Sequence, residues 1–238
     1  MARQNSRNNS MYSQRKVSGR SKGKTFLILC EGEKTEQNYF EGFQKIARAN
    51  KTAYITIKGL GAVGITVVTI AKQLKEQGNY GDDEVWCVFD RDLKYENNNQ
   101  QNFNAAIRLA IENQLNLAVY NDAFELWFLL HYEYYQSETH RSEHEKMLSI
   151  RLGEKYEKNS ETMYEKLKDK ESNAINFAKK LWLNHCNLHG IDDPDKLTIE
   201  QRIIIHNINP STTVYQLVEK LNEVIFTKPQ KELKSGNP

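Results

Sequence analysis

The amino-acid sequence predicts an α/β protein in which a mainly parallel, four-stranded sheet is flanked by helices and followed by a helical C-terminal part. Up to about residue 135, short apolar runs typical of strands alternate with amphipathic helical patterns, the order expected of right-handed crossover units. Between about 138 and 205 the pattern is helical and charged. The longest apolar runs are too short to cross a bilayer, so we expect no membrane-spanning segment.

The N-terminal residues differ in composition from the rest of the chain. Seven Lys and Arg residues and no acid fall within residues 1–24, in a stretch rich in Ser, Asn and Gly. This composition predicts a disordered basic tail over 1–23, without the apolar stretch of a signal peptide. Such a tail can bind phosphate backbones or keep the protein soluble, and both roles stay open. We expect an α/β domain over 24–135 and a helical part over 136–238, whose last helix packs back on the core.

The individual elements follow from the periodicity of apolar residues. The predicted strands are 25–30, 53–58, 84–89 and 115–120. The predicted helices of the α/β domain are 35–49, 65–77, 102–114 and 123–135. In the first helix Tyr39 and Phe43 share an apolar face. Thr35 is placed to cap its start, and Glu36 suits the positive helix terminus.

Later segments carry further structural signals. Residues 93–101 are polar, with an Asn/Gln cluster at 97–102, and we expect them to form a loop near the acidic edge of the sheet. The helix over 123–135 is apolar nearly all round, so it should be buried. A last amphipathic helix is predicted over 212–226, after the Asn-Pro-Ser turn that starts at Asn209.

Cysteine and histidine residues show no complete metal-binding pattern. The three cysteines include no CxxC pair and predict buried free thiols in a cytoplasmic protein. His131 lies in the apolar helix and is interpreted as a core residue. The pairs His140/His144 and His185/His189 have helical i,i+4 spacing but no third ligand nearby, so we expect solvated helix faces.

Acidic residues follow two of the predicted strands directly. Strand 25–30 runs into Glu31, and strand 84–89 runs into Asp90 and Asp92. Because the carboxyl ends of parallel strands meet at one edge of a sheet, these side chains are expected to converge. Carboxylate oxygens are the ligands that Mg²⁺ prefers. The sequence therefore predicts a site for Mg²⁺ (or Mn²⁺), although acids at these positions can also begin loops and cap helices.

A further acidic pair lies at the start of the apolar helix. Asp122 and Glu125 are three residues apart, directly after the fourth predicted strand, and so face the same edge. A carboxylate in an apolar helix is costly unless it is paired or bound to a metal. Glu125 is therefore a candidate for the same site.

A glycine pattern follows the second predicted strand. Gly59, Gly61 and Gly64 match GxGxxG between a strand and a helix, which is the context of a dinucleotide-binding fingerprint. A dinucleotide-binding site would not explain the acids that follow the strands. The preferred interpretation is a tight turn whose backbone amides can meet a phosphate.

Four motifs occur in a fixed order within residues 24–226. They are Leu29-Cys-Glu-Gly-Glu-Lys-Thr-Glu-Gln-Asn-Tyr-Phe40, Phe89-Asp-Arg-Asp92, Phe124-Glu-Leu-Trp-Phe-Leu-Leu-His131 and Asn209-Pro-Ser-Thr-Thr-Val214. Together they resemble the RloB-like family of bacterial proteins found beside restriction–modification and antiphage loci. The first two are also similar to the Toprim catalytic fold of topoisomerases, primases and overcoming-lysogenization-defect nucleases.

The resemblance implies a Toprim-like fold in which Glu31, Asp90 and Asp92 hold Mg²⁺ for phosphodiester chemistry, with Glu36 as a further acid. It also implies an ABC-type ATPase as a partner. Where the family has a Ser-Asn-Pro-Cys-like stretch before Phe-Glu-Leu-Trp, this chain has Tyr-Asn-Asp-Ala. Asp122 is thus an additional acid, which leaves the second metal position open.

The leading hypothesis is a Mg²⁺-dependent nuclease acting in antiphage defence. Glu36 and Glu125 would assist a second ion, and the candidate general base is Glu31, followed by Glu36. Lys34 or Arg91 would clamp the phosphate.

Two other hypotheses stay open. One is a non-cleaving nucleotide or nucleic-acid sensor that regulates a partner ATPase, and the other is a dinucleotide-binding protein that uses the glycine pattern. In all cases we expect a cytoplasmic protein that does not bind membranes. The nuclease and nucleic-acid sensor hypotheses add a nucleic-acid partner, and a homo-oligomer is allowed.

Overall fold

The computed structural model describes residues 24–78, 80, 83–91 and 96–226. The predicted basic tail over 1–23 and the predicted metal ligand Asp92 lie outside these residues. The three cysteines are buried and free, as expected. Within the described ranges, no helix combines the length and apolar character needed to span a membrane.

The described residues form one five-stranded sheet with helices on both faces and a helical C-terminal part. The strands are β1 (Lys24–Cys30), β2 (Ala53–Gly59), β3 (Glu84–Asp90), β4 (Asn116–Asn121) and β5 (Ser211–Thr212). The helices are α1 (Thr35–Asn50), α2 (Gly64–Glu76), α3 (Glu96–Glu112), α4 (Glu125–Leu129), α5 (Arg141–Leu152), α6 (Met163–Leu167), the 3₁₀ turn η1 (Lys168–Lys170), α7 (Glu171–Leu188), α8 (Ile199–His206) and α9 (Val214–Phe226). The predicted fold class, a mainly parallel α/β sheet with a helical C-terminal part, is confirmed.

The strand order β2-β1-β3-β4-β5 places β1 in the interior of the sheet. The first four strands are parallel, and β5 is antiparallel to β4. Cys30, the last residue of β1, lies opposite Gly59 of β2 and Val88 of β3. The residues that follow β1 and β3 are therefore neighbours at one edge of the sheet.

The fifth strand is a difference from the predicted four-stranded sheet. Thr212, expected to begin the last helix, instead lies opposite Tyr120 of β4. The backbone N–H of Thr213 donates to the Val119 carbonyl at 2.8 Å, and the Thr213 hydroxyl accepts from the Val119 N–H at 3.0 Å. These bonds satisfy backbone groups that an uncovered edge of β4 would leave unpaired, and α9 begins only after them.

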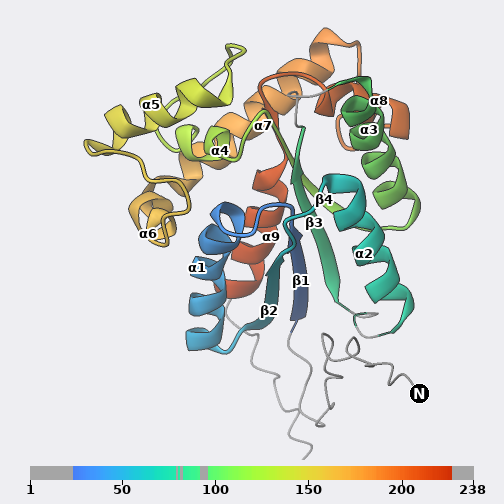
Figure 1. The fold of residues 1–238 in the computed structure, drawn as a ribbon, viewed down its shortest axis with the longest axis horizontal. Coiled ribbons are helices and arrows are strands. Elements are labelled where there is room, and N and C mark those ends of the chain that lie inside the picture. Colours follow the sequence, from blue (N-terminus) through green and yellow to red (C-terminus); the bar gives the residue numbers. More distant parts are fainter. Residues whose placement is uncertain (1–23, 79, 81–82, 92–95, 227–238) are drawn as a thin grey trace, which may run out of the picture.

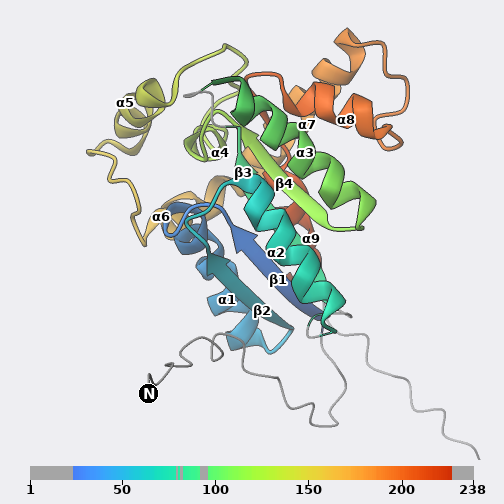
Figure 2. The same ribbon diagram turned by 45° about the vertical axis from the view of Figure 1, so that its right-hand side comes forward.

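Helices cover the two faces of the sheet in separate layers. Figure 1 shows α1 and α9 on one face and α2 and α3 on the other, and Figure 2 shows α2 and α3 side by side. Alternate β1 residues serve the two layers, with Phe26 and Ile28 in the core beneath α1 and α9 and Leu27 and Leu29 in the core beneath α2 and α3. All four are fully buried, and each such burial contributes about 1.5–3 kcal/mol.

The apolar segment predicted as one helix over 123–135 is helical only in α4, so its predicted length was wrong. The prediction that it is buried is confirmed, because all residues of α4 are buried. The His131 side chain explains the early end. Its Nδ1 bonds to the Trp127 carbonyl at 2.9 Å, which is the acceptor that the His131 backbone N–H would use in a continuing helix. That N–H donates instead to the Phe128 carbonyl, in a tighter turn.

The loop predicted over 93–101 was wrong from residue 96 onward, because α3 begins at Glu96 and contains the whole Asn/Gln cluster. A side-chain network supports this polar start of the helix. The Gln100 amide donates to Asn104 at 2.9 Å and accepts from Arg91 at 2.9 Å. Asn207, directly after α8, also donates to Asn104 at 2.9 Å. These tertiary contacts offset the weak helix propensity of asparagine.

The histidine predictions are only partly confirmed. His131 is fully buried, as expected of a core residue, and burial lowers its pKa to about 4. The expectation of a solvated His144 was wrong, because its side chain is buried and packs beside the Tyr135 ring. The face of α5 that carries His144 packs against α4. This contact could not be predicted, because the residues around His144 are mostly charged. His185 is half-buried and bonds to the Pro210 carbonyl at 2.8 Å, whereas His189 is exposed.

Close packing accounts for the GxGxxG glycines. A Cβ at Gly59 would lie 2.6 Å from the Gly32 carbonyl oxygen, in the loop after β1. Gly61 has a positive φ of 57°, a conformation that favours glycine. A Cβ at Gly64 would lie 2.6 Å from Cδ2 and 2.9 Å from Cγ of Phe89, which is fully buried. Gly59 and Gly61 thus bring the β2–α2 turn against the loop after β1, and Gly64 brings the start of α2 against β3.

Gly64→Ala tests this packing. We expect the added methyl group to lower the free energy of unfolding by about 1–3 kcal/mol, because the buried ring must shift. In a Phe89→Leu background the same substitution should cost less, since the smaller side chain leaves room. Chemical denaturation of the four variants in this double-mutant cycle measures the difference. Equal costs in both backgrounds would contradict the contact.

Candidate functional site

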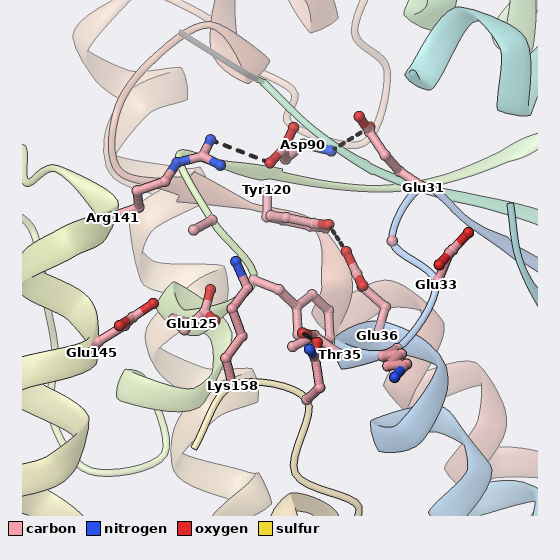
Figure 3. Close-up of a pocket in the computed structure, with 15 residues that line it drawn as sticks. Glu31, Glu33, Thr35, Glu36, Asp90, Tyr120, Glu125, Arg141, Glu145 and Lys158 are labelled. Carbon is pink, nitrogen blue, oxygen red and sulfur yellow. Dashed lines mark hydrogen bonds and ion pairs between the residues drawn. The ribbon is translucent and has the colours of Figure 1, made fainter. Parts of the chain in front are cut away.

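A cavity of about 210 Å³ lies at the carboxyl ends of β1, β3 and β4, between the sheet and the helical C-terminal part. Figure 3 shows that its side chains come from the β1–α1 loop and the first turn of α1, the ends of β3 and β4, the start of α4, α5 and the loop before α6. Its charged lining residues are Glu31, Glu33, Lys34, Glu36, Asp90, Glu125, Arg141, Glu145 and Lys158.

Glu31 and Asp90, the first two predicted metal ligands, are neighbours in this cavity. The Glu31 N–H donates to the Val88 carbonyl at 2.8 Å, which continues the pairing of β1 with β3 by one residue. The Asp90 backbone N–H donates to Oε2 of Glu31 at 3.3 Å. The two acidic strand ends therefore converge at one edge of the sheet, as the sequence analysis expected.

These two carboxylates fit a hard divalent cation. Mg²⁺ usually takes one or two protein carboxylates and completes its shell with water and phosphate oxygens. Among the described residues, no group of three or more His, Cys, Asp or Glu side chains forms a candidate metal cage. The third predicted ligand, Asp92, lies outside those residues. A metal held by Glu31 and Asp90 would thus keep positions open for a substrate.

Arg141, the first residue of α5, bridges two acids at the rim of the cavity. Its Nη2 lies 2.8 Å from Oδ1 of Asp122 and 3.4 Å from Oδ2 of Asp90. The same Nη2 donates to the Asp122 backbone carbonyl at 3.0 Å. The Asp122 side chain is 3% exposed, so this buried carboxylate depends on Arg141 as its counter-ion.

Glu36 and Glu125 each accept a hydrogen bond from a tyrosine hydroxyl. The Tyr120 hydroxyl donates to Glu36, and the Tyr156 hydroxyl donates to Glu125 at 2.8 Å. Burial raises the pKa of Glu36, and the charge of Glu125 raises it as well. The hydrogen bond from Tyr120 and the charge of Lys158 partly offset that rise. A buried carboxyl with a raised pKa can hold or release a proton closer to neutral pH than an exposed one.

The predicted phosphate clamps occupy different places. Lys34 is exposed and lines the cavity. Arg91 is not part of the lining, because its guanidinium donates to Gln100 and to the Asn207 carbonyl. Lys158 was not predicted, and Figure 3 shows its side chain extending into the cavity.

Thr35 was expected to cap α1, but Lys34 is the N-cap residue there. The Thr35 hydroxyl donates instead to Oδ1 of Asn159 at 2.8 Å. This bond ties the start of α1 to the loop that carries Lys158. The placement of Glu36 in the first turn of α1 is as predicted.

Four residues of the site were not predicted from the sequence, namely Arg141, Tyr120, Tyr156 and Lys158. Tyr120 had a usable signal, because it lies at the end of the fourth predicted strand. The other three are in a charged helical region where similar residues usually face solvent. Only the packing of that region against the strand ends brings them to the cavity.

The raised pKa of Glu36 makes a testable contribution to stability. An acid with a raised folded-state pKa stabilises the protein below its unfolded pKa, near the ordinary value of 4.5, and this contribution is lost as pH rises through the folded pKa. Glu36→Gln removes the titration. We expect the variant to gain stability relative to wild type as pH rises above about 4.5, by roughly 1.4 kcal/mol for each unit of raised pKa.

Urea unfolding of both proteins across pH 4–8 measures this difference. Tyr120→Phe gives a second check, because losing the hydroxyl should raise the pKa of Glu36 further and extend the pH window upward. A stability difference between Glu36→Gln and wild type that stays constant with pH would contradict the assignment.

Comparison with known proteins identifies the family. No curated protein and no solved structure matches this chain. The model of the family described as RloB-like protein matches residues 26–221. The match covers the sheet except for the first two residues of β1, every lining residue of the cavity and most of α9. The chain therefore belongs to the RloB-like protein family.

Proposed function

We propose that this protein is a Mg²⁺- or Mn²⁺-dependent nuclease that cleaves phosphodiester bonds of DNA or RNA, with a Toprim-like catalytic domain. The observation that carries the proposal is the hydrogen bond from the Asp90 backbone N–H to the Glu31 carboxylate, because it keeps that carboxylate beside Asp90 at one edge of the sheet. The cationic side chains of Arg141 and Lys158 share the cavity, so a group that would bind metal lies near groups that would bind phosphate.

The chemistry divides among these residues. Glu31 and Asp90, with Asp92 as a further candidate, would hold the metal, which when bound supplies charge stabilisation to the phosphodiester. Arg141 and Lys158 would orient phosphate oxygens, a role we place there instead of at Arg91.

Two carboxylates are the candidate bases. Glu31 lies beside Asp90, where the metal would bind, and Glu36 has a pKa that burial raises above its ordinary value, which favours proton transfer at a higher pH than for an exposed glutamate. Glu125, held by Tyr156, would support Glu36 or a second ion.

The biological setting of the proposal rests on the family resemblance alone. We propose that the nuclease acts in antiphage defence, together with an ABC-type ATPase. The basic segment over 1–23 would add affinity for nucleic acid without sequence preference, which should appear as strong salt dependence.

A second candidate function is a non-cleaving sensor of nucleotides or nucleic acid. The observation that favours it is the pair of cationic side chains in the cavity, since phosphate binding alone requires cations and no metal. A sensor of this kind does not require the Glu31 and Asp90 carboxylates, so we place the sensor function second.

Cleavage assays distinguish the two functions. Purified protein is incubated with tRNA, single-stranded DNA or duplex DNA, in Mg²⁺, Mn²⁺ or EDTA. We expect metal-dependent cleavage that falls at least about 100-fold in Glu31→Gln and in Asp90→Asn, because each loses a charged metal ligand.

Glu76→Gln is the matched control for these assays, because Glu76 pairs with Lys72 on α2 and does not line the cavity. It should cleave as wild type does. Tight nucleic-acid binding without cleavage in any metal, also in the presence of the partner ATPase, would favour the sensor.

A further inference from the structure

Arg141 lies closer to Asp122 than to Asp90. It contacts Asp122 through Oδ1 at 2.8 Å and the backbone carbonyl at 3.0 Å, and the Arg141 backbone N–H donates to Oδ2 of Asp122 at 3.3 Å. The distance from its guanidinium to Oδ2 of Asp90 is longer, at 3.4 Å. Asp122 therefore holds the guanidinium through the shorter contacts.

The two acids also differ in how far their side chains are exposed. The Asp122 side chain is 3% exposed, whereas those of Asp90 and Arg141 are 16% and 22% exposed. A charge costs more to leave without its counter-ion the more deeply it is buried, so Asp122 is the costlier of the two acids to separate from Arg141. The contact with Asp90 is thus the one that a competing cation can replace.

We propose that Arg141 is the counter-ion of Asp90 until a divalent cation binds there, and that Asp122 then holds the displaced guanidinium beside the metal as a phosphate-binding group. This inference rests on the proposed function, because the cation site is that of Glu31 and Asp90. It deepens that function by naming the residue that couples metal binding to phosphate binding.

Because Arg141 lies beside Asp90, it would compete with a cation for Asp90 and would also help to bind a phosphate. A guanidinium and a divalent cation both neutralise Asp90, so they compete while no anion is present. Once the cation is bound, two positive groups face one cavity, where a phosphate oxygen is stabilised by both. Figure 3 shows Arg141 and Glu31 on opposite sides of Asp90, so a cation bound at Glu31 and Asp90 would lie near the guanidinium.

Asp122 would also have a role in this arrangement. This acid takes the place of a residue that the resemblance led us to expect to be uncharged. Its contacts make it a positioning residue for Arg141 instead of a metal ligand.

Mn²⁺ binding to the full chain, followed by electron paramagnetic resonance without nucleic acid, tests the competition. Arg141→Gln should bind Mn²⁺ roughly twofold to fivefold more tightly than wild type, the worth of a partly exposed ion pair. Arg151→Gln is the matched control, because it removes the same charge from the same helix and pairs with Glu133 outside the cavity lining. It should leave the affinity unchanged.

Phosphorus relaxation of inorganic phosphate, at equal amounts of bound Mn²⁺, tests the second half. Phosphate held beside the metal relaxes faster, and this enhancement should fall in Arg141→Gln but persist in Arg151→Gln. Because Arg141→Gln leaves the buried Asp122 charge unpaired and can impair folding, the Asp122→Asn/Arg141→Gln double variant is measured in parallel and should show both effects.

The possible failures are distinct. If wild type binds no Mn²⁺, the proposed function and this inference both fall. If wild type binds Mn²⁺ but neither Arg141 variant binds it more tightly, the inference alone is overturned. The inference alone is also overturned if both Arg141 variants show the same Mn²⁺-induced enhancement of phosphate relaxation as wild type.

Discussion

The candidate site depends on the parallel pairing of β1 with β3. Cys30 lies opposite Val88, so Glu31 emerges beside Asp90 with its carboxylate at the Asp90 amide. Both strands are buried on both faces, and a slip of one residue would turn each side chain to the wrong core. The register that packs the core is therefore the register that brings together two acids 59 residues apart in the chain.

The site is completed from the helical C-terminal part of the chain. The sheet supplies acids, whereas α5 and the loop after it supply Arg141, Tyr156 and Lys158. Acids alone suit a cation, and cations alone suit an anion. Their combination in one cavity suits a metal-bound phosphate, which is why phosphodiester chemistry is the function we place first.

The features that could be predicted from the sequence are those that follow from the periodicity of strands and helices. The parallel sheet and the meeting of Glu31 with Asp90 follow from apolar runs that end in acids. The end of α4 did not follow, because a single bond from His131 to the Trp127 carbonyl interrupts an apolar run that otherwise looks helical. Arg141 was also missed, since its partner Asp90 is 51 residues away and nothing local distinguishes this arginine from a solvated one.

A crystal structure with Mn²⁺, located by anomalous scattering, tests the central claim most directly. The account predicts one ion within about 2.0–2.3 Å of carboxylate oxygens of both Glu31 and Asp90. It also predicts that Arg141 leaves Asp90 while staying on Asp122. An ion bound elsewhere, with the contact between Arg141 and Asp90 intact, would contradict it.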